Sequence, residues 1–145
     1  MPDHHKIKNS MTVVTSKYLG KARVESVHNA TGEKTTTDAG KAAGGLGEYG
    51  NPVEVLCTSL AACALTVTGL HAEKAGLDFT GCYAEVTHYE EDFSTFVVTK
   101  ICITFHLKAE YDEKQRKKLE AFSYRACFVG NSLTAEKEFT FVYDL

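Results

Sequence analysis

The stretch Asn51–Leu77, NPVEVLCTSLAACALTVTGLHAEKAGL, constrains the fold more than any other part of the chain. Asn51 is a good N-cap, Pro52 suits the first helical position, and Glu54 has the spacing of a capping-box partner. Gly76 can end a helix in a left-handed turn. The segment therefore predicts one long helix with a defined start and a defined end.

This predicted helix is apolar or small on nearly every side. Residues 55–70 carry no charge, and most positions outside the apolar stripe are Ala, Ser, Thr or Gly. The stripe has helical spacing and consists of Val53, Leu56, Leu60, Cys63, Val67 and Leu70. The apolar run is interrupted by Ser and Thr and falls short of the roughly 20 residues of a membrane span. We therefore expect a core helix that needs partners on several sides.

Composition narrows the class of protein. The length of 145 residues predicts a single domain over 12–145, preceded by a polar, flexible tail over 1–11. The net charge of -3 argues against nucleic acid or an anionic membrane as the main partner. The start of the chain does not resemble a signal peptide, so we expect a cytoplasmic protein. Five cysteines without a Cys-x-x-Cys pair disfavour both a disulfide-stapled fold and a zinc ribbon, and we expect no metal and no cofactor.

The rest of the chain alternates in the manner of strands, with one further helix. The strands are predicted at Thr12–Tyr18, Ala22–Val27, Glu33–Thr37, Phe79–Tyr89, Phe96–Ala109 and Phe139–Tyr143. Asp112–Ala126 is amphipathic and predicts a second helix. The glycine-rich segment 38–50 contains Gly-x-Gly-x-x-Gly but lacks a βαβ context, which favours a loop near a site over a nucleotide site. The order of elements predicts an α+β fold on an antiparallel sheet.

The hairpin around the predicted turn at 90–95 fixes the orientation of two cysteines. Matching the apolar faces of its strands requires paired residue numbers with an odd sum, such as Val86 with Thr99. Cys82 then faces the core and Cys102 the outer face. They should not pair across the strands, and we interpret both as structural cysteines.

Two segments together resemble the OsmC/Ohr family, named for osmotically inducible protein C and organic hydroperoxide resistance protein. The signature helix of that family opens with Asn-Pro-x-Glu and carries its reactive cysteine after an Ala-rich segment, as in Ala61-Ala62-Cys63. The second cysteine of the family begins a Cys-Pro-Val-Ser-like segment, to which Cys127–Leu133 is similar. The resemblance extends from about Lys17 to Leu145 and includes the order of elements.

The resemblance implies both an assembly and an activity. It implies an intertwined homodimer in which antiparallel sheets wrap around long central helices. It also implies a thiol-dependent peroxidase for organic hydroperoxides, with lipid hydroperoxides as candidates, that a dithiol reductant recycles. Carried over by position, Cys63 attacks the peroxide and Cys127 resolves the product as a disulfide.

The residues that would activate the Cys63 thiol match the family pattern less well. In the family an arginine before the helix serves this purpose and is held by a glutamate directly after Asn-Pro, where this chain has Val53. Arg23 lies in the right region, although it could equally be an exposed strand residue. Glu54 is a second candidate, but it is more simply the capping partner of Asn51. Val53 favours an alternative function, the binding of a small apolar ligand or redox sensing without turnover, whereas the two cysteines favour the enzyme.

Overall fold

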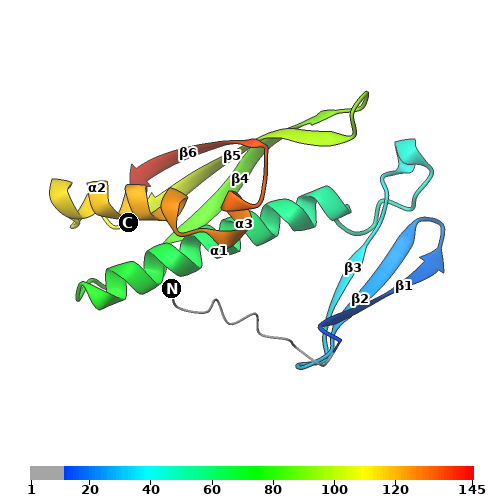
Figure 1. The fold of residues 1–145 in the computed structure, drawn as a ribbon, viewed down its shortest axis with the longest axis horizontal. Coiled ribbons are helices and arrows are strands. Elements are labelled where there is room, and N and C mark those ends of the chain that lie inside the picture. The colour runs from blue at the N-terminus through cyan, green and yellow to red at the C-terminus, as the bar shows by residue number, and fades with distance from the viewer. Residues whose placement is uncertain (1–11) are drawn as a thin grey trace, which may run out of the picture. The chain divides into compact units, whose positions relative to one another are not determined.

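The computed structural model describes residues 12–145 (Figure 1), so the tail predicted at 1–11 lies outside the described residues. The chain forms two compact units that meet in sequence between Val55 and Leu56. Each unit is considered by itself below. The organisation of 12–145 as a single domain stays a prediction.

The first unit contains a three-stranded antiparallel sheet in the order β1-β2-β3. Its strands are β1 (Val14–Gly20), β2 (Arg23–His28) and β3 (Glu33–Thr37), close to the predicted ranges, and a 3-10 turn, η1 (Lys41–Ala43), follows. Lys21 and Ala22 form the β1–β2 turn with φ of 52° and 61°. Both values lie in the left-handed region that favours glycine, so this turn is strained.

Helix α1 (Pro52–Lys74) begins and ends as predicted. The Asn51 side chain accepts from the Glu54 N–H at 2.9 Å, and the Glu54 carboxylate accepts from the Asn51 N–H at 3.1 Å, which is a capping box. Gly76 has a φ of 78° and donates to Glu73, while the Leu77 N–H donates to the carbonyl of Ala72. These two bonds form a Schellman motif.

The face of α1 that is buried in the chain differs from the predicted one. Among the fully buried residues only Leu60 belongs to the predicted stripe, and Leu70 is 54% exposed. The buried face consists of Cys57, Leu60, Ala64, Thr68 and Ala72. Because α1 is apolar or small all round, periodicity could not select the face, and the small residues allow the sheet to approach closely.

By length and composition α1 could also cross a membrane, so the prediction that its apolar run is too short for a span was wrong. A core helix passes the same test. Here Leu60, Ala64 and Ala72 are completely buried in the hydrophobic core of the chain.

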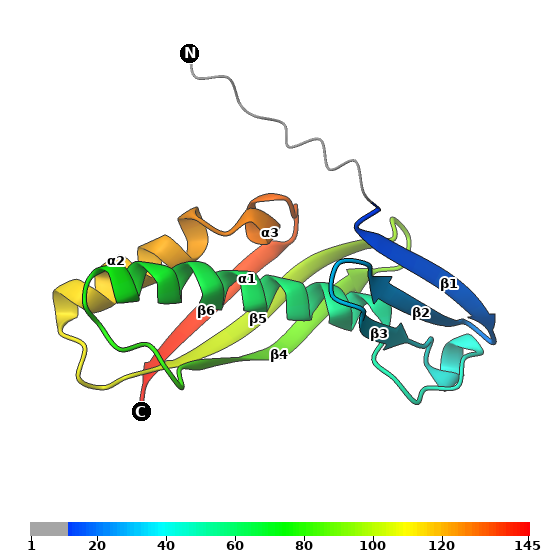
Figure 2. The ribbon, with the colours of Figure 1, turned by 90° about the horizontal axis from the view of Figure 1, so that it is seen from below.

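The second unit contains a three-stranded sheet in the order β4-β5-β6, with β4 (Tyr83–Asp92), β5 (Val97–Leu107) and β6 (Glu136–Tyr143). The predicted α+β class is confirmed, but β6 is parallel to β5, so this sheet is mixed rather than antiparallel throughout. The connection between these strands contains α2 (Glu113–Arg125) and α3 (Phe128–Asn131), a crossover long enough for parallel pairing. Figures 1 and 2 show α1, α2 and α3 on the same side of this sheet.

The hairpin register also differs from the predicted one. Val86 pairs with Ile103 rather than with Thr99, because β4 continues to Asp92 and the turn lies at 93–96. The sum of paired residue numbers is odd up to Val86, even from His88 to Glu90, and odd again at Glu91 and Asp92, because two irregularities shift the register. Alternate β5 residues from Ile101 to Leu107 are buried against the helices.

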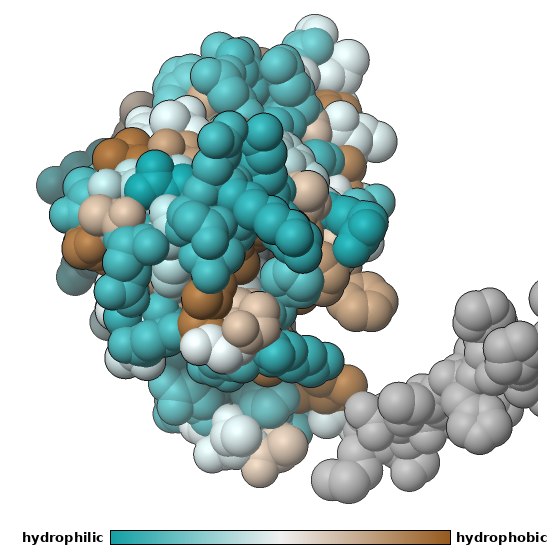
Figure 3. All heavy atoms as spheres, turned by 90° about the vertical axis from the view of Figure 1, so that its left-hand side faces the viewer, coloured by the Kyte–Doolittle hydropathy of each residue, from teal (hydrophilic) through white to brown (hydrophobic). Residues whose placement is uncertain are grey.

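Helix α2 covers the end of the sheet with a polar outer surface. Asp112 and Gln115 form its capping box, and Leu119 is buried beneath it. Seen from the end of the molecule where α2 lies, the surface is mostly hydrophilic (Figure 3). The exposure of Lys117 and Lys118 agrees with the amphipathic pattern from which this helix was predicted.

Candidate active site

The second unit brings Cys63 and Cys127 together, although they lie far apart in the sequence. The two side chains lie close enough for Cys63 to raise the pKa of Cys127, and both thiols are reduced. Cys63 is half-buried in the middle of α1, next to the buried face that Leu60 and Ala64 form. Cys127 is 1% exposed and is the N-cap of α3. Two thiols this close can be joined by a disulfide without a large movement of the chain.

The Cys127 sulfur stabilises the turn that follows it by accepting a backbone hydrogen bond. The Gly130 N–H donates to the Cys127 Sγ at 3.2 Å, as an N-cap side chain accepts from the first turn of a helix. A Cβ on Gly130 would lie 3.3 Å from this sulfur and 3.4 Å from Leu60 Cδ1. Glycine at this position therefore allows α3 to pack closely against both Cys127 and α1.

The environment of Cys127 favours its thiol form. Burial raises the pKa of Cys127, the Gly130 N–H opposes this rise, and the neighbouring Cys63 thiol adds to it. A buried thiol with a raised pKa is a poor first nucleophile toward a peroxide that arrives from solvent. Cys63 is the more exposed of the two residues.

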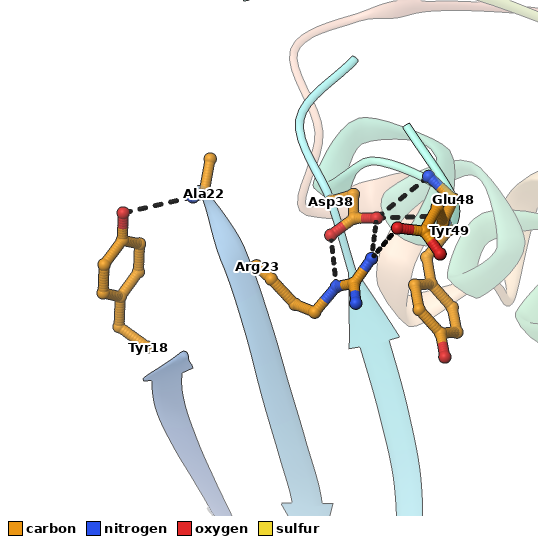
Figure 4. A network of polar contacts seen from close by, with 6 residues as sticks. All are labelled: Tyr18, Ala22, Arg23, Asp38, Glu48 and Tyr49. Atoms are coloured by element: carbon orange, nitrogen blue, oxygen red, sulfur yellow. Dashed lines mark hydrogen bonds and ion pairs between the residues drawn. The ribbon is translucent and has the colours of Figure 1, made fainter. Parts of the chain in front are cut away.

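Arg23 lies in the first unit, in a network of polar contacts (Figure 4). Its Nε and one terminal nitrogen bind the two carboxylate oxygens of Asp38, each at 2.8 Å. Glu48 lies 3.1 Å from the guanidinium, which stacks over the ring of Tyr49 with its central carbon 4.9 Å from the ring centroid. With a side chain 22% exposed, Arg23 is not the plain exposed strand residue of the alternative interpretation.

Asp38 is the fixed centre of this network. Its side chain is completely buried, and besides Arg23 it accepts from the backbone N–H groups of Glu48 and Tyr49 at 3.0 and 3.2 Å. The hydrogen bonds from Arg23 lower the pKa of Asp38 to about 2, and this carboxylate raises the pKa of Arg23. One carboxylate thus holds the arginine and the glycine-rich loop that leads into α1.

The site residues predicted from the sequence fall into the two units. Cys63 and Cys127 form the thiol pair of the second unit, whereas Arg23 and Glu54 belong to the first, where Glu54 closes the capping box of α1. The sequence analysis missed Asp38, Glu48, Tyr49 and Gly130. Asp38 could have been found, because the pairing of Val24 with Thr37 makes Arg23 and Asp38 the next neighbours across the strands.

The three remaining cysteines lie elsewhere in the second unit. Cys57 is buried on α1, Cys82 packs against the core near Tyr111, and Cys102 lies on the outer face, where its thiol contacts Glu138. The predicted orientation of Cys82 and Cys102 is therefore confirmed. Among residues 12–145 no group of three His, Cys, Asp or Glu side chains could hold a metal ion.

The first unit also contains an apolar hollow of about 430 Å³. Valines and small hydroxyl side chains of the sheet line it, together with the start of α1: Val14, Val24, Ser26, Thr35, Thr37, Pro52 and Val55. A hollow of this size could accept a small apolar ligand.

The fold and the thiol pair define a class of small α+β proteins with a redox-capable cysteine pair beside a long central helix. The family model described as OsmC-like protein matches residues 45–142. The chain therefore belongs to the OsmC family, as its two sequence motifs predicted. No sequence among the curated proteins matches the chain.

Solved structures support the fold over nearly the whole chain. A crystal structure from Psychrobacter arcticus, described as an osmotic stress induced and detoxification response protein, is 28% identical. It covers 91% of this chain and 96% of its own, with a TM-score of 0.85. An OsmC-like protein from Mycoplasma pneumoniae is 17% identical, with coverages of 93% and 99% and a TM-score of 0.74. An organic hydroperoxide resistance protein from Elizabethkingia anophelis is 13% identical, with coverages of 95% and 100% and a TM-score of 0.74.

Proposed function

We propose that this protein is a thiol-dependent peroxidase that reduces organic hydroperoxides, lipid hydroperoxides among them, through a Cys63–Cys127 disulfide cycle. The observation that carries the proposal is that the packing of α3 against α1 brings together Cys63 and Cys127, which come from distant parts of the chain. Membership of the family, together with the hydroperoxide resistance protein among its structural neighbours, supports it.

The proposed reaction has two steps. The Cys63 thiolate attacks the terminal oxygen of the hydroperoxide, the O–O bond breaks, and the alkoxide leaves as the alcohol after taking a proton. Cys63 is thereby oxidised by two electrons to a sulfenic acid. The Cys127 sulfur then attacks the Cys63 sulfur, the S–S bond forms, the S–O bond breaks, and water leaves.

We assign the first attack to Cys63 because it is half-buried, whereas Cys127 is 1% exposed. From the resemblance to the family we assign the activation of the Cys63 thiolate to Arg23. Within the first unit, the bidentate pair with Asp38 fixes the orientation of its guanidinium. In this proposal Glu54 fixes the start of the helix that carries Cys63. A dithiol reductant of a reducing cytoplasm would restore the pair.

We further propose that the protein is an intertwined homodimer. Part of α1 remains exposed in the chain as a stripe of mostly small residues that ends in a leucine: Ser59, Ala62, Thr66 and Leu70. A second copy of α1 could approach this stripe closely. Sedimentation at micromolar concentration should give a dimer, which Ala62→Arg should convert to monomer; a monomeric native protein would refute this assembly.

The test of the peroxidase is an anaerobic titration of thiols with one equivalent of cumene hydroperoxide. The native protein should lose two thiols, Cys127→Ser should lose one and retain a sulfenic acid, and Cys63→Ser should lose none. Cys82→Ser and Cys102→Ser are matched controls, which should behave as the native protein. Equal behaviour of all four variants would refute the assignment.

The apolar hollow of the first unit supports a second candidate, the binding of a small apolar ligand without turnover. An apolar fluorescent probe should then bind to the native protein and lose affinity when Val24→Asp places a charge in the hollow. If the native protein binds the probe but consumes no hydroperoxide, this candidate replaces the peroxidase.

A further inference from the structure

Lys137 occupies a position in β6 where an apolar residue is expected. Strand β6 alternates in exposure, and its inward-facing residues are Lys137, Phe139, Phe141 and Tyr143. The backbone of Lys137 pairs with Ile101, which is completely buried. A charged side chain on the core face of a strand needs hydrogen-bond partners, because burial without them is costly.

The partners of Lys137 are two carbonyls of the segment that follows Cys127. The Lys137 Nζ donates to the carbonyl of Gly130 at 2.9 Å and to the carbonyl of Leu133 at 2.7 Å. No carboxylate of residues 12–145 forms an ion pair with Lys137, so these two bonds account for its specific contacts there. The ammonium group therefore closes the turn that extends from Cys127 to Leu133.

Gly130 connects this ammonium to the thiol pair. Its carbonyl accepts from Lys137, while its N–H donates to the Cys127 Sγ. Cys127 in turn lies beside Cys63, close enough for Cys63 to raise its pKa. Two consecutive hydrogen bonds thus lead from the core face of β6 to the Cys127 sulfur, which would form the disulfide with Cys63.

We propose that Lys137 is a positioning residue for disulfide formation, holding the Cys127–Leu133 segment so that the Cys127 sulfur stays within reach of an oxidised Cys63. The inference rests on the proposed cysteine pair, and it concerns the second step, in which the Cys127 sulfur displaces water from Cys63. Small displacements of reacting atoms can reduce a rate by as much as 100-fold, so releasing this segment should slow the step strongly.

The test compares Lys137→Met, Lys137→Arg and the control Lys100→Met after one equivalent of cumene hydroperoxide. Lys100 lies on the neighbouring strand and forms a partly exposed ion pair with Glu138 at 2.9 Å, away from the cysteine segment. Timed samples are alkylated for disulfide analysis, and a 1,3-diketone traps sulfenic acid. Lys137→Met should consume peroxide at the native rate but form the disulfide about 10- to 100-fold more slowly, with accumulation of sulfenic acid.

The arginine and glutamine variants of Lys137 distinguish a positioning role from a merely structural one. Lys137→Arg retains charged donors for both carbonyls and should recover most of the rate, whereas Lys137→Gln is shorter and uncharged and should lie between Met and Arg. Lys100→Met should match the native protein. Native disulfide formation in Lys137→Met, or an arginine variant no faster than the methionine variant, overturns the proposal. If Lys137→Met does not fold, the ordering of the Gln and Arg variants decides.

Oxidation by diamide tests the positioning role of Lys137 independently of any peroxidase activity. Diamide takes two electrons and two protons from the thiol pair and becomes a hydrazine, so it forms the disulfide without any peroxide. A native protein that closes the disulfide with diamide but consumes no hydroperoxide refutes the peroxidase. Slower closure in Lys137→Met with diamide then still supports the positioning role, and closure at the native rate still overturns it.

Discussion

Replacing Gly130 by alanine should displace the Cys127 thiol at a calculable cost. The new Cβ would lie 3.3 Å from Cys127 Sγ and 3.4 Å from Leu60 Cδ1, closer than ordinary packing. Cys127 and Leu60 are almost completely buried, so neither can move aside freely. Overpacking of this kind costs about 1–3 kcal/mol. Alanine also lowers the conformational entropy of the unfolded chain, which stabilises the folded protein by about 0.4–1 kcal/mol. This gain applies here because Gly130 does not have a positive φ.

The expected net destabilisation by Gly130→Ala is therefore about 0.5–2 kcal/mol. Urea unfolding at a single protein concentration measures it, since a dimer would make the midpoint concentration-dependent. Gly40→Ala is the matched control: nothing lies within 4 Å of its new Cβ, and its φ of -65° suits alanine. It should be neutral or slightly stabilising. The same two variants, assayed with diamide, should show slower disulfide closure for Gly130→Ala alone.

A double-mutant cycle identifies the cause. Leu60→Ala alone should cost about 2–5 kcal/mol, because its side chain is completely buried. In the double variant the new methyl group meets the space that the leucine leaves, so the combined cost should fall below the sum by at least about 0.5 kcal/mol. Simple additivity, or a Gly130→Ala protein as stable as the native one, would refute the packing argument.

Three further predictions concern other parts of the chain. Ala22→Gly should stabilise the protein by about 1 kcal/mol in thermal unfolding, because φ is 61° at this position; no gain would show that the turn is not strained. Hydrogen bonding to Asp144 raises the pKa of His106, so the stability that His106 contributes is fully present below about pH 6.5 and is lost as pH rises through the higher folded pKa. His106→Gln should therefore destabilise the protein at pH 5.5 more than at pH 8.5, and melts with equal losses at both would contradict this. Asp38→Asn should slow peroxide consumption at least about tenfold, as expected when a buried bidentate partner is removed; a native rate would separate Arg23 from the chemistry.

Local sequence signals predicted where the helices and strands lie better than they predicted how these elements pack and pair. The ends of α1 follow from Asn51, Glu54 and Gly76, whose backbone preferences act within one turn of the helix. The buried face of α1 does not, because several faces are equally apolar. The parallel pairing of β6 depends on a crossover whose path the local pattern does not encode.

The candidate site shows the same division. Family motifs selected Cys63 and Cys127, but only the packing of α3 against α1 shows that the two residues lie near each other. The partner of Arg23 was accessible in principle from the β2–β3 register, which places Asp38 opposite it. Lys137 could also have been noticed as a charged residue in the apolar alternation of the last strand, although its carbonyl partners could not have been inferred.

The missing carboxylate at position 53 is a weaker argument against an enzyme once the partners of Arg23 are known. The resemblance assigns the anchoring carboxylate to this position, where the chain has Val53, and that difference favoured a binding protein over an enzyme. Arg23 is nevertheless held by two carboxylates from another segment: buried Asp38, which fixes its orientation, and Glu48, which is 62% exposed and adds charge. Because the guanidinium already has a bidentate partner, Val53→Glu should not increase the alkylation rate of Cys63. The new charge at a half-buried position should instead destabilise the protein by about 1–3 kcal/mol. Faster alkylation without a lower melting temperature would show that Arg23 exchanges Asp38 for the new carboxylate, and that the anchor at position 53 is the one the chemistry requires.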